Sequence, residues 1–111
     1  MVRGAMGLVL GVWLCIPVLA FAQDNPYVLV IKDHHFEPAV LKLPGGQKIK
    51  VTIDNQDSSP EEFESHELNR EKVISGKSKA IVYIGPLKKG ASYRFMGEFH
   101  QETAQGNIIV E

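Results

Sequence analysis

Three short segments of the chain concentrate side chains of the types that bind metal ions. Their candidate ligands, in chain order, are His34, His35, Glu62, Glu64, Met96, Glu98 and His100. Carboxylates suit hard cations, imidazoles suit iron and copper, and a thioether is a soft ligand. None of the segments is specific alone, but their joint occurrence in one small chain predicts metal binding.

In the segment 60–66, two of the glutamates flank one aromatic residue. If the segment is extended, Glu62 and Glu64 share one face and Phe63 enters the core on the other. Two carboxylates on one face repel each other unless a cation or a basic group lies between them. This pattern predicts a hard-cation site that suits iron. The alternative is a solvated acidic rim that Arg70 and Lys72 neutralise.

The segment 96–102 combines three kinds of ligand. Strand alternation would place Met96, Glu98 and His100 on one face, with Phe95 and Phe99 on the other, where they are expected to anchor the core with Phe63. A thioether, a carboxylate and an imidazole can together hold copper or iron. The alternative for Met96 is a filler of the core or of the surface.

The adjacent pair His34 and His35 follows an expected strand. Neighbouring residues of a strand point to opposite faces, so both rings can face one ion only if the segment is a loop. We therefore expect one of the two to be a ligand. The alternative is a pair of exposed polar residues at a strand end.

The elements that position these residues are expected to be short strands separated by Gly and Pro turns. Residues 67–74 have room for a helical turn, and no segment has a sustained helical period. The pattern is typical of a small all-β sandwich. Strands are expected at 27–31, 40–43, 48–54, 80–84, 91–96 and 107–110.

Residues 1–22 are predicted to be a secretory signal peptide. Arg3 precedes an uncharged apolar run over 5–22, which ends in the small-x-small pattern before Gln23. An uncleaved anchor is the alternative, because a run of this length can just span a bilayer. The chain's one cysteine, Cys15, lies inside this run. The expected mature protein is one exported domain, 23–111, without a cysteine.

Length, charge and motifs exclude several classes of function. A chain of 111 residues allows one domain, and its net charge of −1 argues against nucleic acid as a partner. No nucleophile or phosphate-binding motif of the common enzyme classes is present. An ordinary enzyme is therefore not expected.

The C-terminal half resembles the signature of cupredoxins, in which Tyr-x-Phe-x-Cys-x-x-His is followed by an axial Met and then by Gly-x-x-x-Val. The matching residues here are Tyr93, Phe95, Gly97, His100, Gly106 and Val110. The resemblance covers nearly all of 23–111 and implies a Greek-key β-sandwich. Gly97 stands in place of the thiolate ligand, and of the four copper ligands only His100 is retained. The resemblance therefore implies a cupredoxin-like fold without a type 1 blue-copper centre.

More closely, the segments 60–65, 70–73 and 97–100 resemble the small periplasmic cupredoxin-like proteins that accompany bacterial high-affinity iron permeases. They are also similar to the cupredoxin domain of the periplasmic iron-uptake lipoprotein, where a Glu-aromatic-Glu motif is associated with iron. This implies a periplasmic protein that captures iron with Glu62, Glu64 and Glu98, while His100 and His35 complete the site or hold copper.

The implied partners are a membrane iron permease and other periplasmic iron-uptake components. The protein would hand iron to the permease, or assist Fe(II) oxidation if copper is bound. Two alternatives remain open at this point. One is a copper carrier or redox partner without iron specificity, and the other is a metal-free structural or interaction module.

Overall fold

The computed structural model describes residues 4, 11 and 26–111 of the chain. Cys15, the predicted cleavage site and the predicted signal peptide, apart from Gly4 and Gly11, lie outside the described residues. Among the residues that are described, no helix has the length and apolar character needed to cross a membrane.

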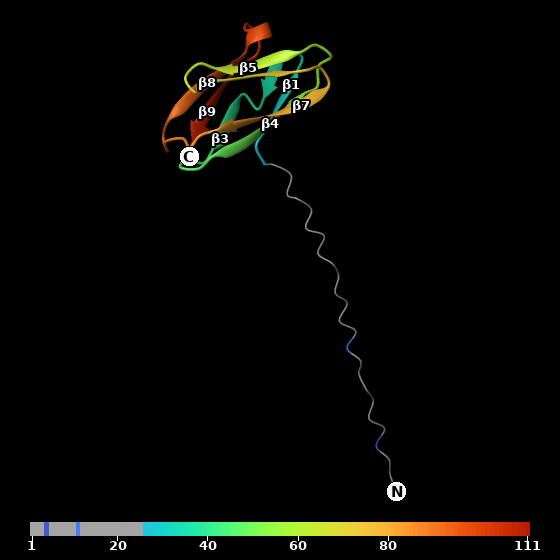
Figure 1. Ribbon diagram of the computed structural model, residues 1–111, viewed down its shortest axis with the longest axis vertical. Coiled ribbons are helices and arrows are strands. Elements are labelled where there is room, and N and C mark those ends of the chain that lie inside the picture. Colours follow the sequence, from blue (N-terminus) through green and yellow to red (C-terminus); the bar gives the residue numbers. More distant parts are fainter. Residues whose placement is uncertain (1–3, 5–10, 12–25) are drawn as a thin grey trace.

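Residues 26–111 form two β-sheets packed face to face (Figure 1). The first sheet has the strand order β2-β1-β4-β7, and the second has the order β3-β9-β8-β5-β6. The pairs β1–β4 and β3–β9 are parallel, and the other neighbours are antiparallel. The predicted all-β sandwich is confirmed. The bounds are β1 Val28–Lys32, β2 His35–Glu37, β3 Val40–Leu43, β4 Ile49–Asn55, β5 Glu61–Ser65, β6 Arg70–Ile74, β7 Ser78–Ile84, β8 Ser92–Gly97, the short 3-10 helix η1 Glu98–His100, and β9 Gln105–Val110.

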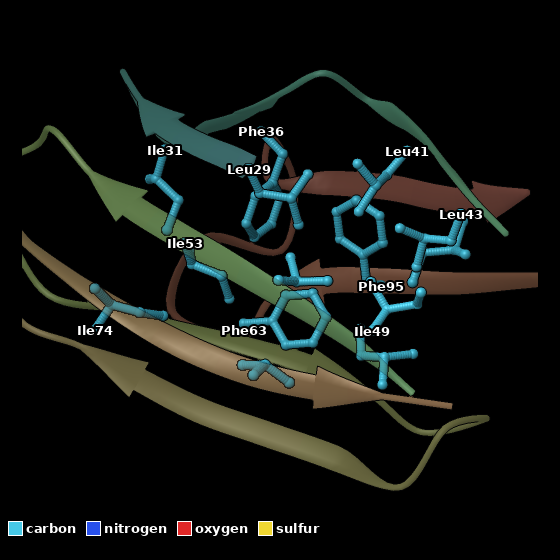
Figure 2. Close-up of a cluster of buried hydrophobic side chains, with 14 of the residues drawn as sticks. Leu29, Ile31, Phe36, Leu41, Leu43, Ile49, Ile53, Phe63, Ile74 and Phe95 are labelled. Atoms are coloured by element: carbon cyan, nitrogen blue, oxygen red, sulfur yellow. The ribbon is translucent and has the colours of Figure 1, made fainter. Parts of the chain in front are cut away.

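The core lies between the sheets and is centred on three phenylalanines, one each from β2, β5 and β8 (Figure 2). The ring centroids of Phe36 and Phe95 lie 5.0 Å apart at an angle of 85°, which is the edge-to-face geometry that aromatic rings favour. The Phe63 ring lies 5.4 Å from that of Phe95 and is fully buried. The expectation that Phe63 and Phe95 anchor the core is confirmed.

The helical turn expected within 67–74 is not found, although the first of these residues do belong to a turn. Residues 66–69 form a tight turn, and Arg70–Ile74 is strand β6. This strand pairs antiparallel with β5 along its whole length, so its backbone hydrogen bonds complete a hairpin instead of a helix. One consequence of the register is that Glu64 and Glu71 lie opposite each other.

The strand alternation expected over 95–100 stops at Gly97, where β8 ends. The next three residues form η1, which turns the chain out of the sheet. Phe99 is therefore 48% exposed, and the prediction that it packs in the core is wrong. The same turn separates Glu98 from His100, so the prediction that they share one strand face with Met96 is also wrong.

Candidate metal centre

The outer face of β5 presents the two glutamates that the sequence singled out. Along this strand the buried residues alternate with half-buried ones, so Glu62 and Glu64 point away from the core. Phe63 lies between them and is buried in the core. The predicted sharing of one face is confirmed, and the side chain of Glu64 is only 14% exposed.

Five side chains from β5, the turn after it, β6 and η1 gather on this face. Possible ligand atoms of Glu64, His66 and Glu98 all lie within 4.8 Å of one another, and so do those of Glu62, Glu64 and Glu71. Ligand atoms that share one ion through bonds of about 2.1 Å lie at most about 4 Å apart, so modest side-chain movements would close either set around a cation. We call these five residues the carboxylate–imidazole cluster.

The local environment raises the pKa of two of these carboxyl groups. Loss of hydration, and then the nearby charge of Glu71, raise the pKa of Glu62 above its ordinary value of 4.5. The pKa of Glu64 is also raised, first by a hydrogen bond shared with Glu98 and then by loss of hydration and the charge of Glu98. A bound cation would relieve this repulsion.

Neighbouring basic residues do not neutralise the carboxylates. The guanidinium group of Arg70 donates hydrogen bonds to the carbonyl oxygens of Tyr83, Leu68 and Asn69. Among the described residues, neither Arg70 nor Lys72 forms an ion pair with the cluster. The basic side chain in contact with the cluster is His66, whose Nδ1 lies 3.3 Å from Oε1 of Glu64. The alternative of a rim neutralised by Arg70 and Lys72 is therefore not supported.

Met96 lies beside the cluster. It is directly opposite Glu64 in the β5–β8 pairing, so both side chains are on the outer face. Together with His66 these two residues line a pocket of ≈ 160 Å³. The structure thus brings Met96 close to the predicted iron ligands and not to His100.

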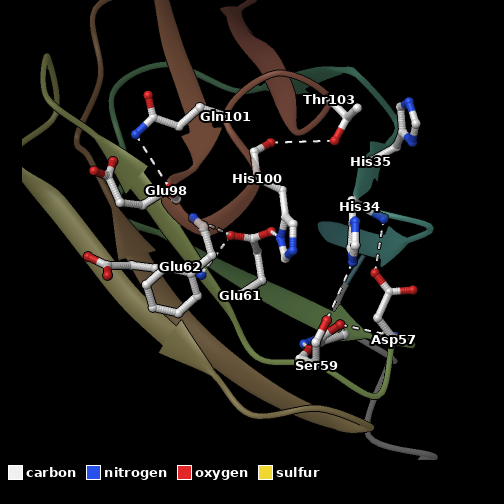
Figure 3. A network of polar contacts seen from close by, with 12 residues as sticks. His34, His35, Asp57, Ser59, Glu61, Glu62, Glu98, His100, Gln101 and Thr103 are labelled. Carbon is white, nitrogen blue, oxygen red and sulfur yellow. Dashed lines mark hydrogen bonds and ion pairs between the residues drawn. The ribbon is translucent and has the colours of Figure 1, made fainter.

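His100 points to the other side of β5, towards the inside of the sandwich end (Figure 3). Its Nδ1 lies 2.5 Å from Oε2 of Glu61, a residue whose side chain is only 1% exposed. The ring also stacks on that of His34, with centroids 3.5 Å apart and planes inclined by 13°. His100 and His34 therefore form a second cluster with Glu61, separate from the first.

The position of His34 depends on a tight turn between β1 and β2. Asp33 and His34 both have positive φ angles, 51° and 60°, as a two-residue hairpin loop of type I′ requires. The carboxylate of Asp57 accepts hydrogen bonds from both of their backbone N–H groups, at 2.8 Å and 3.0 Å. Burial alone would raise the pKa of Asp57, but these hydrogen bonds and nearby positive charge outweigh it and hold the pKa below 3.8.

His35 takes no part in either cluster. It begins β2, is exposed, and its Nδ1 donates a hydrogen bond to the carbonyl oxygen of Asp33 at 2.7 Å. His34 lies in the turn before β2 and not at a strand end as expected, so strand alternation does not describe this pair. That one of the two histidines is a metal ligand stays a prediction.

Three residues of these clusters were not among the predicted ligands. Glu71 could be found from the sequence only once the β5–β6 hairpin was known, because its register places Glu71 opposite Glu64. His66 follows Glu64 by two residues, but β5 ends at Ser65, so strand alternation does not place His66 and only the turn does. The alternation that places Phe63 inward also places Glu61 inward. A buried glutamate is unusual, so residue type alone gives no reason to predict one there.

Similar proteins share the fold. An uncharacterized protein of Rickettsia prowazekii is 46% identical over 82 residues, which cover 74% of this chain and 65% of the relative. Amicyanin from Paracoccus versutus superposes with a TM-score of 0.60 and 15% identity, covering 81% of this chain and 87% of the amicyanin. The purple cupredoxin from Nitrosopumilus maritimus gives a TM-score of 0.59 and 18% identity, over 77% and 99% of the two chains. At such identities the two solved structures show a common fold and no more.

A family model also matches this chain. The family model described as the cupredoxin-like domain matches residues 5–110. This range includes both clusters and all the strands of the two sheets. The chain therefore belongs to the cupredoxin-like domain family.

Proposed function

We propose that this protein binds iron in the periplasm at the carboxylate–imidazole cluster and hands it to a membrane iron permease. The observation that carries this proposal is the convergence of Glu62, Glu64 and Glu98 with His66 and Glu71 on one face. Oxygen ligands with an imidazole are a donor set that iron accepts in proteins. The Glu-aromatic-Glu motif of the iron-uptake proteins that the sequence resembles supports the same metal.

The position of the cluster suits transient capture. Its ligands lie on the surface of the second sheet, with Glu64 half-buried and His66 72% exposed. An ion bound there remains accessible to a partner protein, whereas a fully enclosed site would release its ion slowly. In this proposal the rigid sandwich fixes Glu62 and Glu64, and the neighbouring turn and η1 supply His66 and Glu98.

Calorimetric titration of the purified protein with citrate-chelated Fe(III), anaerobic Fe(II) and Cu(II) tests the site. We expect the double variant Glu62→Gln/Glu64→Gln to lose iron binding. The matched control is Glu37→Gln/Glu102→Gln, which removes the same charge from two exposed positions and is expected to bind iron as the wild type does. Unchanged iron affinity in the first double variant would refute the carboxylate site.

The partner and the location have their own tests. Cell fractionation should recover the protein in the periplasm with Gln23 at its N-terminus. A gene for an iron permease beside its own gene, and cross-linking to that permease in intact cells, would support the transfer step. Recovery of the full-length chain in the inner membrane would instead favour the anchor alternative.

A copper carrier or redox partner is the second candidate. Its supporting observation is the Glu61–His100 contact, because a carboxylate that holds Nδ1–H leaves Nε2 free to bind a metal. Cu(II) binding that disappears in His100→Gln and persists in Glu62→Gln/Glu64→Gln would favour this function over iron capture.

A further inference from the structure

Gly97 takes the place of the copper thiolate in the cupredoxin pattern, and the space beside it is filled. A Cβ atom on Gly97 would lie 2.6 Å from Cδ of Glu61 and 2.6 Å from Cβ of Ala104. Such distances are far shorter than any normal contact, so a side chain at position 97 cannot coexist with the present Glu61 side chain. The buried carboxylate of Glu61 therefore stands where the pattern expects sulfur.

The Glu61 carboxylate is fully engaged. Its Oε1 accepts hydrogen bonds from the backbone N–H groups of Glu62 and Phe99, both at 3.0 Å, and its Oε2 accepts one from His100 Nδ1. A buried carboxylate is unfavourable unless hydrogen-bond donors surround it, and three donors do so here. The chain's one cysteine, Cys15, is remote in sequence. The described residues at this end of the sandwich do not fit a thiolate copper centre.

The His34–His100 stack is also not a chelating arrangement. A metal bound to an imidazole lies in the plane of the ring, at about 2 Å from nitrogen. The two ring planes are almost parallel and the centroids are 3.5 Å apart, so one ion cannot lie in both planes at that distance. The stack covers one face of His100 and leaves its hydrogen bond to Glu61 intact.

The same contacts fix η1. Glu61 lies on the inner face of β5, and it holds the second and third residues of η1 through the Phe99 N–H and the His100 ring. The first residue of η1 is Glu98, which contributes a ligand atom to the carboxylate–imidazole cluster on the outer face. One buried carboxylate thus connects the strand that carries Glu62 and Glu64 to the segment that carries Glu98.

We propose that the Glu61–His100 pair links β5 to η1, and that Glu61 is a positioning residue for the Glu98 ligand. The inference rests on the proposed function for the outer cluster. Glu61 contacts no bound ion in this scheme and acts only through η1.

A double-mutant cycle tests this role. Glu61→Gln keeps the shape of the side chain and removes its charge, and we expect it to weaken anaerobic Fe(II) binding by about 10–100-fold, as for other residues that orient ligands. In a Glu98→Gln background the Glu61→Gln change should have no further effect, because the ligand that it positions is gone. The absorption spectrum of bound Co(II) should shift in Glu61→Gln, reporting an altered ligand geometry. Glu102→Gln, in the exposed loop after η1, is the control and should match the wild type.

Two results would overturn the inference. One is an equal loss of affinity on Glu61→Gln in the wild-type and Glu98→Gln backgrounds, which would mean a general loss of structure. The other is nitrogen hyperfine coupling of bound Cu(II) that vanishes in His100→Gln, which would make His100 a ligand. Failure of the proposed function gives a different pattern, in which Glu62→Gln/Glu64→Gln binds Fe(II) as the wild type does.

Discussion

Glu64 is the residue on which the outer cluster depends most. It belongs to both groups of ligand atoms, contacts His66, and lies opposite Glu71 and Met96 in the two neighbouring strands. Its half-buried carboxylate faces several others of the same charge, which is unfavourable for folding in the absence of a cation. Under the proposed function, metal binding and metal-free stability therefore make opposite demands on this position.

The first prediction follows from the raised pKa values of Glu62 and Glu64. Ionising these groups costs more in the folded protein than in the unfolded chain. This penalty is absent at a pH well below 4.5, where both states are protonated, and develops as the pH rises through and above that value. Metal-free Glu62→Gln/Glu64→Gln should therefore be more stable than the wild type at neutral pH, with the difference vanishing in acid.

Urea unfolding in the presence of a chelator measures this difference at about pH 7 and about pH 3.5. The control Glu37→Gln/Glu102→Gln removes the same charge from exposed positions and should show a smaller effect. A wild type that is more stable than the cluster variant at neutral pH would contradict the prediction.

At the scale of elements, β5 separates two chemistries by its two faces. Its inner positions carry Glu61, Phe63 and Ser65, all buried, and its outer positions carry Glu62 and Glu64. Phe63 fixes the register of this alternation because its ring is packed against those of Phe36 and Phe95. A shift of one residue in the pairing register of β5 would exchange its inner and outer residues, and neither cluster would form.

The second prediction concerns this anchor. Phe63→Leu leaves part of a fully buried volume unfilled, and we expect it to lower the free energy of unfolding by about 1–3 kcal/mol. Phe99→Leu is the matched control, since Phe99 is 48% exposed and should change stability by less than about 0.5 kcal/mol. Equal losses measured by urea unfolding would show that Phe99 also packs in the core.

The third prediction concerns the hairpin that carries His34. Asp57→Asn leaves one oxygen to accept the two backbone N–H groups of Asp33 and His34, so we expect a loss of about 1–2 kcal/mol at neutral pH. The lowered pKa of Asp57 means that its contribution is present above 3.8 and disappears as the pH falls through the still lower folded value. The difference between variant and wild type should therefore shrink in strong acid. An unchanged His34 ring signal in NMR spectra of Asp57→Asn would contradict the proposed positioning.

The alternation of apolar and polar residues predicts which side chains of a single strand point inward and which point outward. The outward pair Glu62 and Glu64 and the inward Phe63 follow from period two, and the structure has them as expected. The prediction for the segment 96–102 is wrong because strand alternation does not continue past Gly97, where β8 ends and η1 begins. Nothing local marks that end, since Gly97 is placed by its close approach to Glu61 and Ala104.

Pairing across strands was out of reach of the sequence. Glu71 joins the cluster because β5 and β6 form a hairpin in one register. Glu61 and His100 meet although 38 residues lie between them in the chain, and their contact depends on the packing of β5 against η1. Such contacts come from topology, which residue types and spacing do not determine.

For the whole molecule, binding of a cation to the folded state alone should raise stability by mass action. At a free concentration about 100 times the dissociation constant the gain is about 2.7 kcal/mol. In a domain of this size that corresponds to a rise in Tm of about 10–20 °C. We expect this rise for the wild type with anaerobic Fe(II) in a thermal-unfolding assay. Its persistence in Glu62→Gln/Glu64→Gln would place the stabilising ion elsewhere.

Strand β6 forms one edge of the second sheet, and its side chains from Arg70 to Val73 are exposed. The free backbone edge of such a strand is a template on which another chain can add, and alternating charges of Arg70, Glu71 and Lys72 oppose that addition. Glu71 thus has a second role besides its place in the carboxylate–imidazole cluster. Replacing this charged stretch with neutral residues would leave a strand edge prone to edge-to-edge aggregation.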